Sequence, residues 1–147
     1  MSTKKIIVFL VIVLVVVAGF YAWNEYTRTA KDLKQVEASV TTGAIELVNE
    51  FMTDETAANT KYLEKIVMVK GMVKKIVPVD NTYTIVLGDS TDMSSVRCLV
   101  DSTHTAPVAG LQPGIMINIK GYLTGFKKDE TGLLGSDVEL NRCVIQQ

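Results

Sequence analysis

An uninterrupted apolar run near the N-terminus constrains this chain more than any other feature. Residues 6–23 carry no charge across 18 positions and end with the aromatic residues Tyr21 and Trp23. As a helix, the run would be about 27 Å long, close to the hydrocarbon thickness of a bilayer. Aromatic rings favour the membrane interface, and Lys4 and Lys5 stand at the opposite end. The sequence therefore predicts a transmembrane anchor over residues 6–23.

A cleaved signal peptide is the competing interpretation of this run. Such a peptide needs a short apolar core and small residues at its cleavage site, whereas bulky Phe20, Tyr21 and Trp23 stand there. No cysteine follows directly, so a lipoprotein-type attachment has no support. We favour an uncleaved signal-anchor of a single-pass protein. The lysines that abut the run favour a cytoplasmic tail, residues 1–5, and a domain on the extracytoplasmic side of the cytoplasmic membrane.

The next part of the chain has helical periodicity. We interpret residues 24–41 as a juxtamembrane helix or linker and residues 42–147 as the folded domain. Apolar residues recur at spacings of three and four, at Leu33, Val36, Val40, Ala44, Leu47 and Phe51. Packing on the chain's own domain and a coiled-coil seam with a partner are both compatible with this stripe. Thr42 is the expected N-cap of a helix ending at Phe51, and Thr53 is expected to open a second short helix.

Five later segments have the composition and alternation of β-strands. They are residues 66–76, 83–87, 96–100, 115–123 and 138–145. Two of them contain an interior glycine, Gly71 and Gly121, which weakens a strand unless a bend or bulge requires it. Lys70 and Lys120 beside these glycines are expected to be exposed. The pattern predicts a mainly β fold, a five-stranded OB-fold barrel preceded by short helices and the N-terminal transmembrane helix.

The order of several short motifs resembles one known family. From Thr42 to Val144 the sequence is similar to the tRNA_anti-like OB-fold family, small domains that often follow a membrane helix or lipoprotein signal. The matching residues are Leu47, Asp54-Glu55, Ala58, Asn59, Tyr62, Val69-Lys-Gly-Met-Val73, Val96-Arg-Cys98, Pro113-Gly114, Ile119-Lys-Gly121, Gly125, Asp137-Val-Glu-Leu140 and Cys143. The resemblance implies the fold and no established activity.

The two cysteines are candidate structural residues. Members of this family often carry a cysteine two residues after the glycine of the fourth strand, but here that position is Leu123. Cys98 aligns with the inward positions of its strand. Cys143 would face the opposite way from Leu140 unless a bulge intervenes. Two separate buried thiols are the expectation, and a disulfide between neighbouring third and fifth strands is the alternative.

Charge argues against a nucleic-acid partner. The chain has 15 basic and 16 acidic residues, and without Lys4 and Lys5 the rest has 13 against 16. Proteins that bind nucleic-acid phosphates usually have a basic surplus. The candidate ligand or partner surface is Lys70, Lys74, Tyr83 and Arg97. Such sites also need exposed aromatic residues, and Tyr83 falls on the core face of its strand.

Catalytic motifs are absent from the sequence. Asp101, Ser102 and His104 lie in one loop, but three polar residues in a loop do not make a triad without the right geometry. There is no phosphate loop, paired-histidine motif or nucleophile elbow. We therefore expect neither enzyme activity nor a cofactor or metal.

The sequence supports a function hypothesis of the binding class. The first hypothesis is a non-catalytic, membrane-tethered OB-fold module that binds a protein or another envelope component, for example as an accessory subunit of a membrane complex. An oligosaccharide- or oligonucleotide-binding module is the alternative, by analogy with the fold alone.

Overall fold

The computed structural model describes residues 3–26 and 32–146, which form two separate compact units, residues 1–31 and 32–147. The first unit holds the helix α1, Thr3–Tyr26, which contains the whole apolar run. Its side chains are described over residues 11–23. Among the described residues, no helix is both long enough and apolar enough to cross a membrane. The predicted tail and the predicted linker lie partly outside the described residues.

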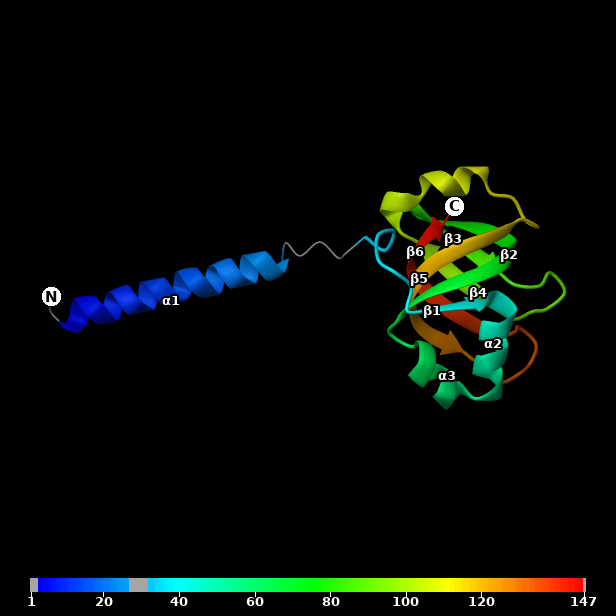
Figure 1. The fold of residues 1–147 in the computed structure, drawn as a ribbon, viewed down its shortest axis with the longest axis horizontal. Coiled ribbons are helices and arrows are strands. Elements are labelled where there is room, and N and C mark those ends of the chain that lie inside the picture. Colours follow the sequence, from blue (N-terminus) through cyan, green and yellow to red (C-terminus); the bar gives the residue numbers. More distant parts are fainter. Residues whose placement is uncertain (1–2, 27–31, 147) are drawn as a thin grey trace. The chain divides into compact units, whose positions relative to one another are not determined.

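The second unit is a closed β-barrel (Figure 1). Its strands are β2 (Ile66–Val79), β3 (Thr82–Leu87), β4 (Ser95–Val100), β5 (Met116–Lys127) and β6 (Asp137–Gln146). Neighbours pair in the order β2-β3-β4-β6-β5, and β5 pairs back with β2 to close the barrel. All these pairs are antiparallel except β4 with β6. The prediction of a mainly β fold with a five-stranded barrel is confirmed.

A sixth strand, β1 (Val40–Gly43), was not predicted. It pairs in parallel with β2, where Val40 lies opposite Val67. Thr42 therefore lies in a strand, and Gly43 is the N-cap of the helix that follows. The expected helical stripe is correct only from Ala44 onward, because Leu33, Val36 and Val40 precede the helix. Threonine and valine tolerate extended backbone well, and pairing with the edge of β2 holds residues 40–42 in that conformation.

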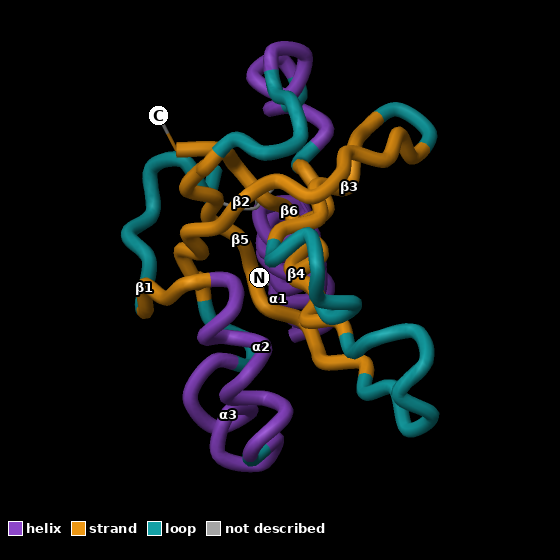
Figure 2. The backbone as a smooth tube through the Cα atoms, turned by 90° about the vertical axis from the view of Figure 1, so that its right-hand side faces the viewer, coloured by secondary structure: helices purple, strands orange, loops and turns teal. Residues whose placement is uncertain are grey.

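Two short helices cover one end of the barrel, and two 3-10 helices lie at the other (Figures 1 and 2). The first pair is α2 (Ala44–Thr53) and α3 (Glu55–Tyr62), and the second is η1 (Ser102–His104) and η2 (Ala106–Gly110). Helix α2 buries one apolar face, formed by Ala44, Leu47, Val48 and Phe51. The N-cap of helix α3 is Asp54, whose carboxylate accepts a hydrogen bond from the Ala57 amide, so Thr53 is not the cap.

The core of this unit is self-contained. Every residue of its hydrophobic cluster lies between Ala44 and Ile145. Inward positions of all five barrel strands contribute to it, and Phe51 stacks on Phe126 with ring centroids 5.1 Å apart. Because all the core residues that the structure describes lie in the second unit, residues 32–147 have what they need to fold independently.

Residues 32–39, which we call the strap, cross the barrel before β1. Lys120 Nζ donates hydrogen bonds to the carbonyl oxygens of Val36 (2.5 Å) and Lys34 (3.3 Å). Leu33 is buried, and the Ser39 amide donates to the Ile66 carbonyl. Lys120 is consequently only 4% exposed. The expectation that Lys120 is exposed is wrong, because the strap covers the outward face of β5.

A β-bulge in β6 corrects the predicted direction of Cys143. The register between β5 and β6 shifts where Lys120 pairs with Val144 but Tyr122 pairs with Asn141. Arg142 has a positive φ of 53°, a conformation typical of bulges. The extra residue turns Cys143 into the core beside Cys98.

Candidate functional site

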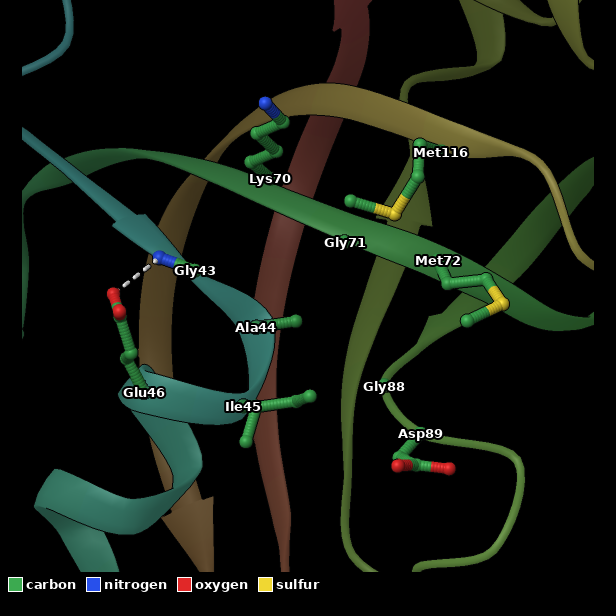
Figure 3. A pocket seen from close by; sticks show the side chains of 10 residues that line it. All are labelled: Gly43, Ala44, Ile45, Glu46, Lys70, Gly71, Met72, Gly88, Asp89 and Met116. Atoms are coloured by element: carbon green, nitrogen blue, oxygen red, sulfur yellow. Dashed lines mark hydrogen bonds between the residues drawn. The ribbon is translucent and has the colours of Figure 1, made fainter.

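An apolar groove lies between α2 and the barrel (Figure 3). Its volume is about 340 Å³. We call it the methionine groove, and it is lined by Gly43, Ala44, Ile45, Glu46, Lys70, Gly71, Met72, Gly88, Asp89 and Met116. These residues come from the end of β1, the first turn of α2, the middle of β2, the loop directly after β3 and the start of β5.

The groove exists because β2 changes partners at this point. Gly43, the last residue of β1, pairs with Lys70, whereas the pairing of β3 begins at Val73. Gly71 and Met72 lie between these two paired segments, and the Gly88 amide donates a hydrogen bond to the Met72 carbonyl oxygen there. A Cβ atom on Gly71 would lie 2.7 Å from the Ala44 Cβ, so only glycine lets α2 begin this close to β2. Gly71 thus shapes the floor of the groove.

Exposed apolar side chains form the rim of the groove. Ile45 is 52% exposed, Met72 38% and Met116 56%. In Figure 3 they extend from α2, β2 and β5 around the same hollow. Ile115, next to Met116 in the chain, is also exposed. Flexible, polarisable methionine side chains are common where a protein surface adapts to a partner.

Polar groups at the edges of the groove are partly engaged in local structure. Glu46 Oε2 accepts a hydrogen bond from the Gly43 amide at 3.2 Å, which stabilises the start of α2. The Thr91 amide and hydroxyl both donate to Asp89 and lower the pKa of its carboxyl group. Lys70 is exposed and forms no ion pair within the described part of the chain.

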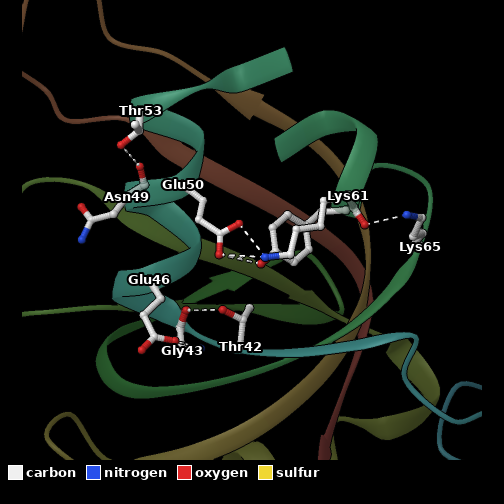
Figure 4. A network of polar contacts seen from close by, with 9 residues as sticks. Thr42, Gly43, Glu46, Asn49, Glu50, Thr53, Lys61 and Lys65 are labelled. Carbon is white, nitrogen blue, oxygen red and sulfur yellow. Dashed lines mark hydrogen bonds and ion pairs between the residues drawn. The ribbon is translucent and has the colours of Figure 1, made fainter. Parts of the chain in front are cut away.

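A polar network fixes α2, the helix that forms one wall of the groove (Figure 4). Both carboxylate oxygens of Glu50 accept hydrogen bonds from Lys61 Nζ, at 3.0 and 2.8 Å. The buried Tyr62 hydroxyl donates to Glu50 Oε1 at 3.0 Å. These hydrogen bonds lower the pKa of Glu50, and the bond from Lys61 has the largest effect. The network therefore joins α2 to α3 at neutral pH.

A second hollow lies on the outer face of β2, β3 and β4. Two adjoining pockets share Arg97, Leu134 and Asp137. We call them together the basic cleft, after its basic residues Lys74, Lys75, Arg97, Lys127 and Lys128. Arg97 Nε lies 2.8 Å from Asp137 Oδ2. Lys74 Nζ donates to the Asp92 and Ser94 carbonyl oxygens.

The four predicted surface residues separate into three places. Lys70 borders the methionine groove, whereas Lys74 and Arg97 line the basic cleft. Tyr83 is half-buried, packs against the core and lines neither hollow. Met72 and Met116 line the groove but were not predicted as site residues. Their outward positions, next to an interior glycine and at a strand start, were the available signal.

The predicted structural cysteines are both buried and free. Burial raises the pKa of the Cys143 thiol well above its ordinary value, and a hydrogen bond with Cys98 adds to this effect. The Cys143 thiol therefore remains protonated at neutral pH. The two thiols pack as small apolar groups without a disulfide, as expected, and are joined by a hydrogen bond.

Two of the three polar loop residues that were considered for a catalytic triad, Asp101 and His104, make structural contacts. The Asp101 carboxylate accepts hydrogen bonds from the Thr103 amide and hydroxyl and caps η1. His104 Nε2 lies 2.8 Å from Asp32 Oδ1 in the strap. The pKa of Asp32 is lowered mainly by a hydrogen bond from the Lys34 amide, and the contact with His104 lowers it further.

Solved structures share this fold at low sequence identity. A candidate nucleic acid-binding lipoprotein from Klebsiella pneumoniae is 16% identical, with a TM-score of 0.54 over 73% of this chain and 92% of its own. Asparaginyl-tRNA synthetase from Pyrococcus horikoshii is 17% identical, with a TM-score of 0.42 over 59% of this chain and 21% of its own. No curated protein matches. The tRNA_anti-like family model matches residues 1–136, and the chain therefore belongs to the tRNA_anti-like family.

Proposed function

We propose that the protein is a non-catalytic, membrane-tethered OB-fold module that binds an apolar segment of a partner protein in the methionine groove. The observation that carries this proposal is the convergence of Ile45, Met72 and Met116, all exposed, on one hollow. Exposed apolar side chains scattered singly need no explanation, but a cluster around a concavity is typical of interaction sites. An accessory subunit of a membrane complex fits this description.

The position of the groove favours an extended ligand segment. It follows β2 through the gap between the end of β1 and the start of the pairing with β3. Lys70 and Asp89 lie among the lining residues and have opposite charges. A bound segment with apolar side chains in the middle and polar ends would match this lining.

The tether in this proposal rests on the sequence. Residues 6–23 are uncharged, Lys4 and Lys5 precede them, and Tyr21 and Trp23 end them. This arrangement favours a cytoplasmic N-terminus and a domain on the extracytoplasmic side. A tether raises the local concentration of the domain near other membrane proteins, so modest affinity in the groove is enough.

An oligonucleotide- or oligosaccharide-binding module is the second candidate. The OB fold favours it, and so does the description of the Klebsiella pneumoniae neighbour as a candidate nucleic acid-binding protein. Against it, neither the methionine groove nor the basic cleft has an aromatic lining residue. Base stacking on aromatic side chains is a main source of affinity for single strands.

Site-specific photo-crosslinking of the full chain in its native membrane tests the first candidate. A benzophenone amino acid replaces Met116, and the matched control replaces Tyr122, which lies on the same strand and is also exposed. We expect a discrete protein adduct from position 116 only, and its loss when Met72→Glu is added. Equal adducts from both positions, or an adduct that survives Met72→Glu, would contradict the proposal.

The second candidate needs a separate measurement. Fluorescence anisotropy of a labelled single-stranded oligothymidine, titrated with residues 32–147, reports binding of nucleic acid. The first candidate predicts no saturable binding at physiological salt. Saturable binding that Arg97→Glu abolishes would support the oligonucleotide hypothesis instead.

A further inference from the structure

Two loops together present the most exposed apolar side chains of the barrel unit. Leu133 is 72% exposed and Leu134 81%, in the loop between β5 and β6, and Met93 of the β3–β4 loop is 63% exposed. The loops lie side by side, because the Ser136 amide donates a hydrogen bond to Ser94 Oγ at 3.1 Å. We call these three side chains the apolar tip.

The loop that carries the leucines is ordered by one carboxylate. Asp129 accepts hydrogen bonds from the Thr131 amide (3.0 Å), the Thr131 hydroxyl (2.6 Å), the Leu134 amide (2.6 Å) and the Gly135 amide (3.2 Å). These hydrogen bonds lower the pKa of Asp129 to about 2, and the bond from the Thr131 hydroxyl has the largest effect. The leucines are thus presented by a fixed loop, so binding costs little ordering entropy.

Basic residues lie directly beside the apolar tip. Leu134 lines both pockets of the basic cleft, and Met93 lines one. Three carboxylates share the cleft, Asp129, Asp137 and Glu139. Asp129 accepts hydrogen bonds from its own loop. Asp137 forms an ion pair with Arg97 and accepts a hydrogen bond from the Ser95 hydroxyl. Lys75, Lys127 and Lys128 form no ion pair within the described part of the chain.

We propose that the apolar tip and the basic cleft dock the domain on a bilayer surface that contains anionic lipid. Leu133 and Leu134 enter the boundary between headgroups and acyl chains, and the lysines contact lipid phosphates. Exposed apolar side chains beside basic residues are complementary to such a surface in both polarity and charge. The proposal is independent of the methionine groove. The tether of the proposed function would strengthen the contact by proximity but is not needed for it.

A tryptophan reporter tests this docking directly. Trp23 is the single tryptophan of the chain, so residues 32–147 contain none, and Leu134→Trp introduces one reporter at the tip. Met116→Trp is the matched control, at an exposed apolar position of the methionine groove. We expect a blue shift for Leu134→Trp with vesicles of equal parts phosphatidylcholine and phosphatidylglycerol. We expect none with pure phosphatidylcholine and none for Met116→Trp.

Vesicle co-sedimentation of the tryptophan-free domain separates the two contributions. The double variant Lys127→Gln with Lys128→Gln should reduce binding roughly tenfold or more, since each basic residue near an anionic surface contributes about fivefold. The double variant Leu133→Ser with Leu134→Ser should also reduce binding roughly tenfold or more, because it removes the apolar side chains that enter the bilayer. Lys70→Gln should leave binding unchanged.

Three results would overturn the docking proposal. They are binding that is insensitive to the leucine pair, equal binding to both kinds of vesicle, and no binding to either. Release of the domain from vesicles by oligothymidine, with the leucine pair irrelevant, would identify a nucleic-acid site in the cleft instead. The methionine groove could fail its own crosslinking test without changing any of these outcomes.

Discussion

Gly121 and Cys143 face each other across the β5–β6 pair at a distance that leaves no room for a side chain. A Cβ atom on Gly121 would lie 2.5 Å from Cys143 Sγ and 3.1 Å from Leu140 Cβ. Gly121 therefore belongs in this strand because the bulge turns a thiol into the space where its side chain would be.

Gly121→Val should destabilise the barrel by about 1–3 kcal/mol or more, because the added atoms must displace buried neighbours. Gly71→Val should do the same against Ala44 and Leu87. Urea denaturation of residues 32–147 measures both. Exposed Lys70→Thr is the control, and its free energy of unfolding is expected to change by no more than about 0.5 kcal/mol.

Addition of Cys143→Ala should relieve part of the destabilisation caused by Gly121→Ala, but none of that caused by Gly71→Ala. Strict additivity at both sites would refute the contact.

Lys120→Met should cost about 1–3 kcal/mol, because it leaves the carbonyl oxygens of Val36 and Lys34 without their donor under the strap. Lys70→Met is the matched control on the neighbouring strand, and it should be nearly neutral. Amide hydrogen exchange in residues 32–39 should accelerate only in the Lys120 variant. Equal denaturation midpoints would mean that the strap does not depend on this ammonium group.

Acid should weaken the contribution of Asp129. Its pKa in the folded state, about 2, is below its ordinary value of 3.8, so the stabilisation is present above about pH 4 and is lost as the pH falls toward 2. The difference in denaturation midpoint between the native domain and Asp129→Asn should therefore shrink over that range. A difference that stays constant from pH 5 to about pH 2 would contradict this assignment.

Residues 32–147 should form a soluble, β-rich fragment, and residues 41–147 a less stable one. The shorter fragment lacks buried Leu33, the strap and the first residue of β1. Thermal unfolding followed by far-UV circular dichroism compares the two. Identical curves would show that the strap adds nothing to the stability of the barrel.

The barrel was predictable because its strands have strong local signals. Alternation along residues 115–123 and the turn residues between segments predicted the five strands within a few positions. The interior glycines also marked real constraints, since Gly71 and Gly121 both lie against buried neighbours. These features depend on the alternation of apolar residues and on turn residues, and both can be seen in a single sequence.

Other features depend on contacts between distant residues, and no local pattern contains them. The burial of Lys120 depends on residues 34–36, and the direction of Cys143 depends on a bulge at Arg142. Strand β1 forms only because β2 offers it an edge. The methionine groove likewise arises where several elements meet, so its residues could not be recognised from their own neighbourhoods.

The pairing of β2 with β5 also sets the order in which the domain can assemble. Residues 66–72 pair with residues 116–122, and β6 must then fill the space between β5 and β4. The backbone hydrogen bonds of helices α2 and α3 are local, so these helices can form early. The first barrel strand, by contrast, has an unpaired edge until the last strands have been synthesised. Binding of that edge by a chaperone during synthesis would protect the chain when it is most prone to aggregate.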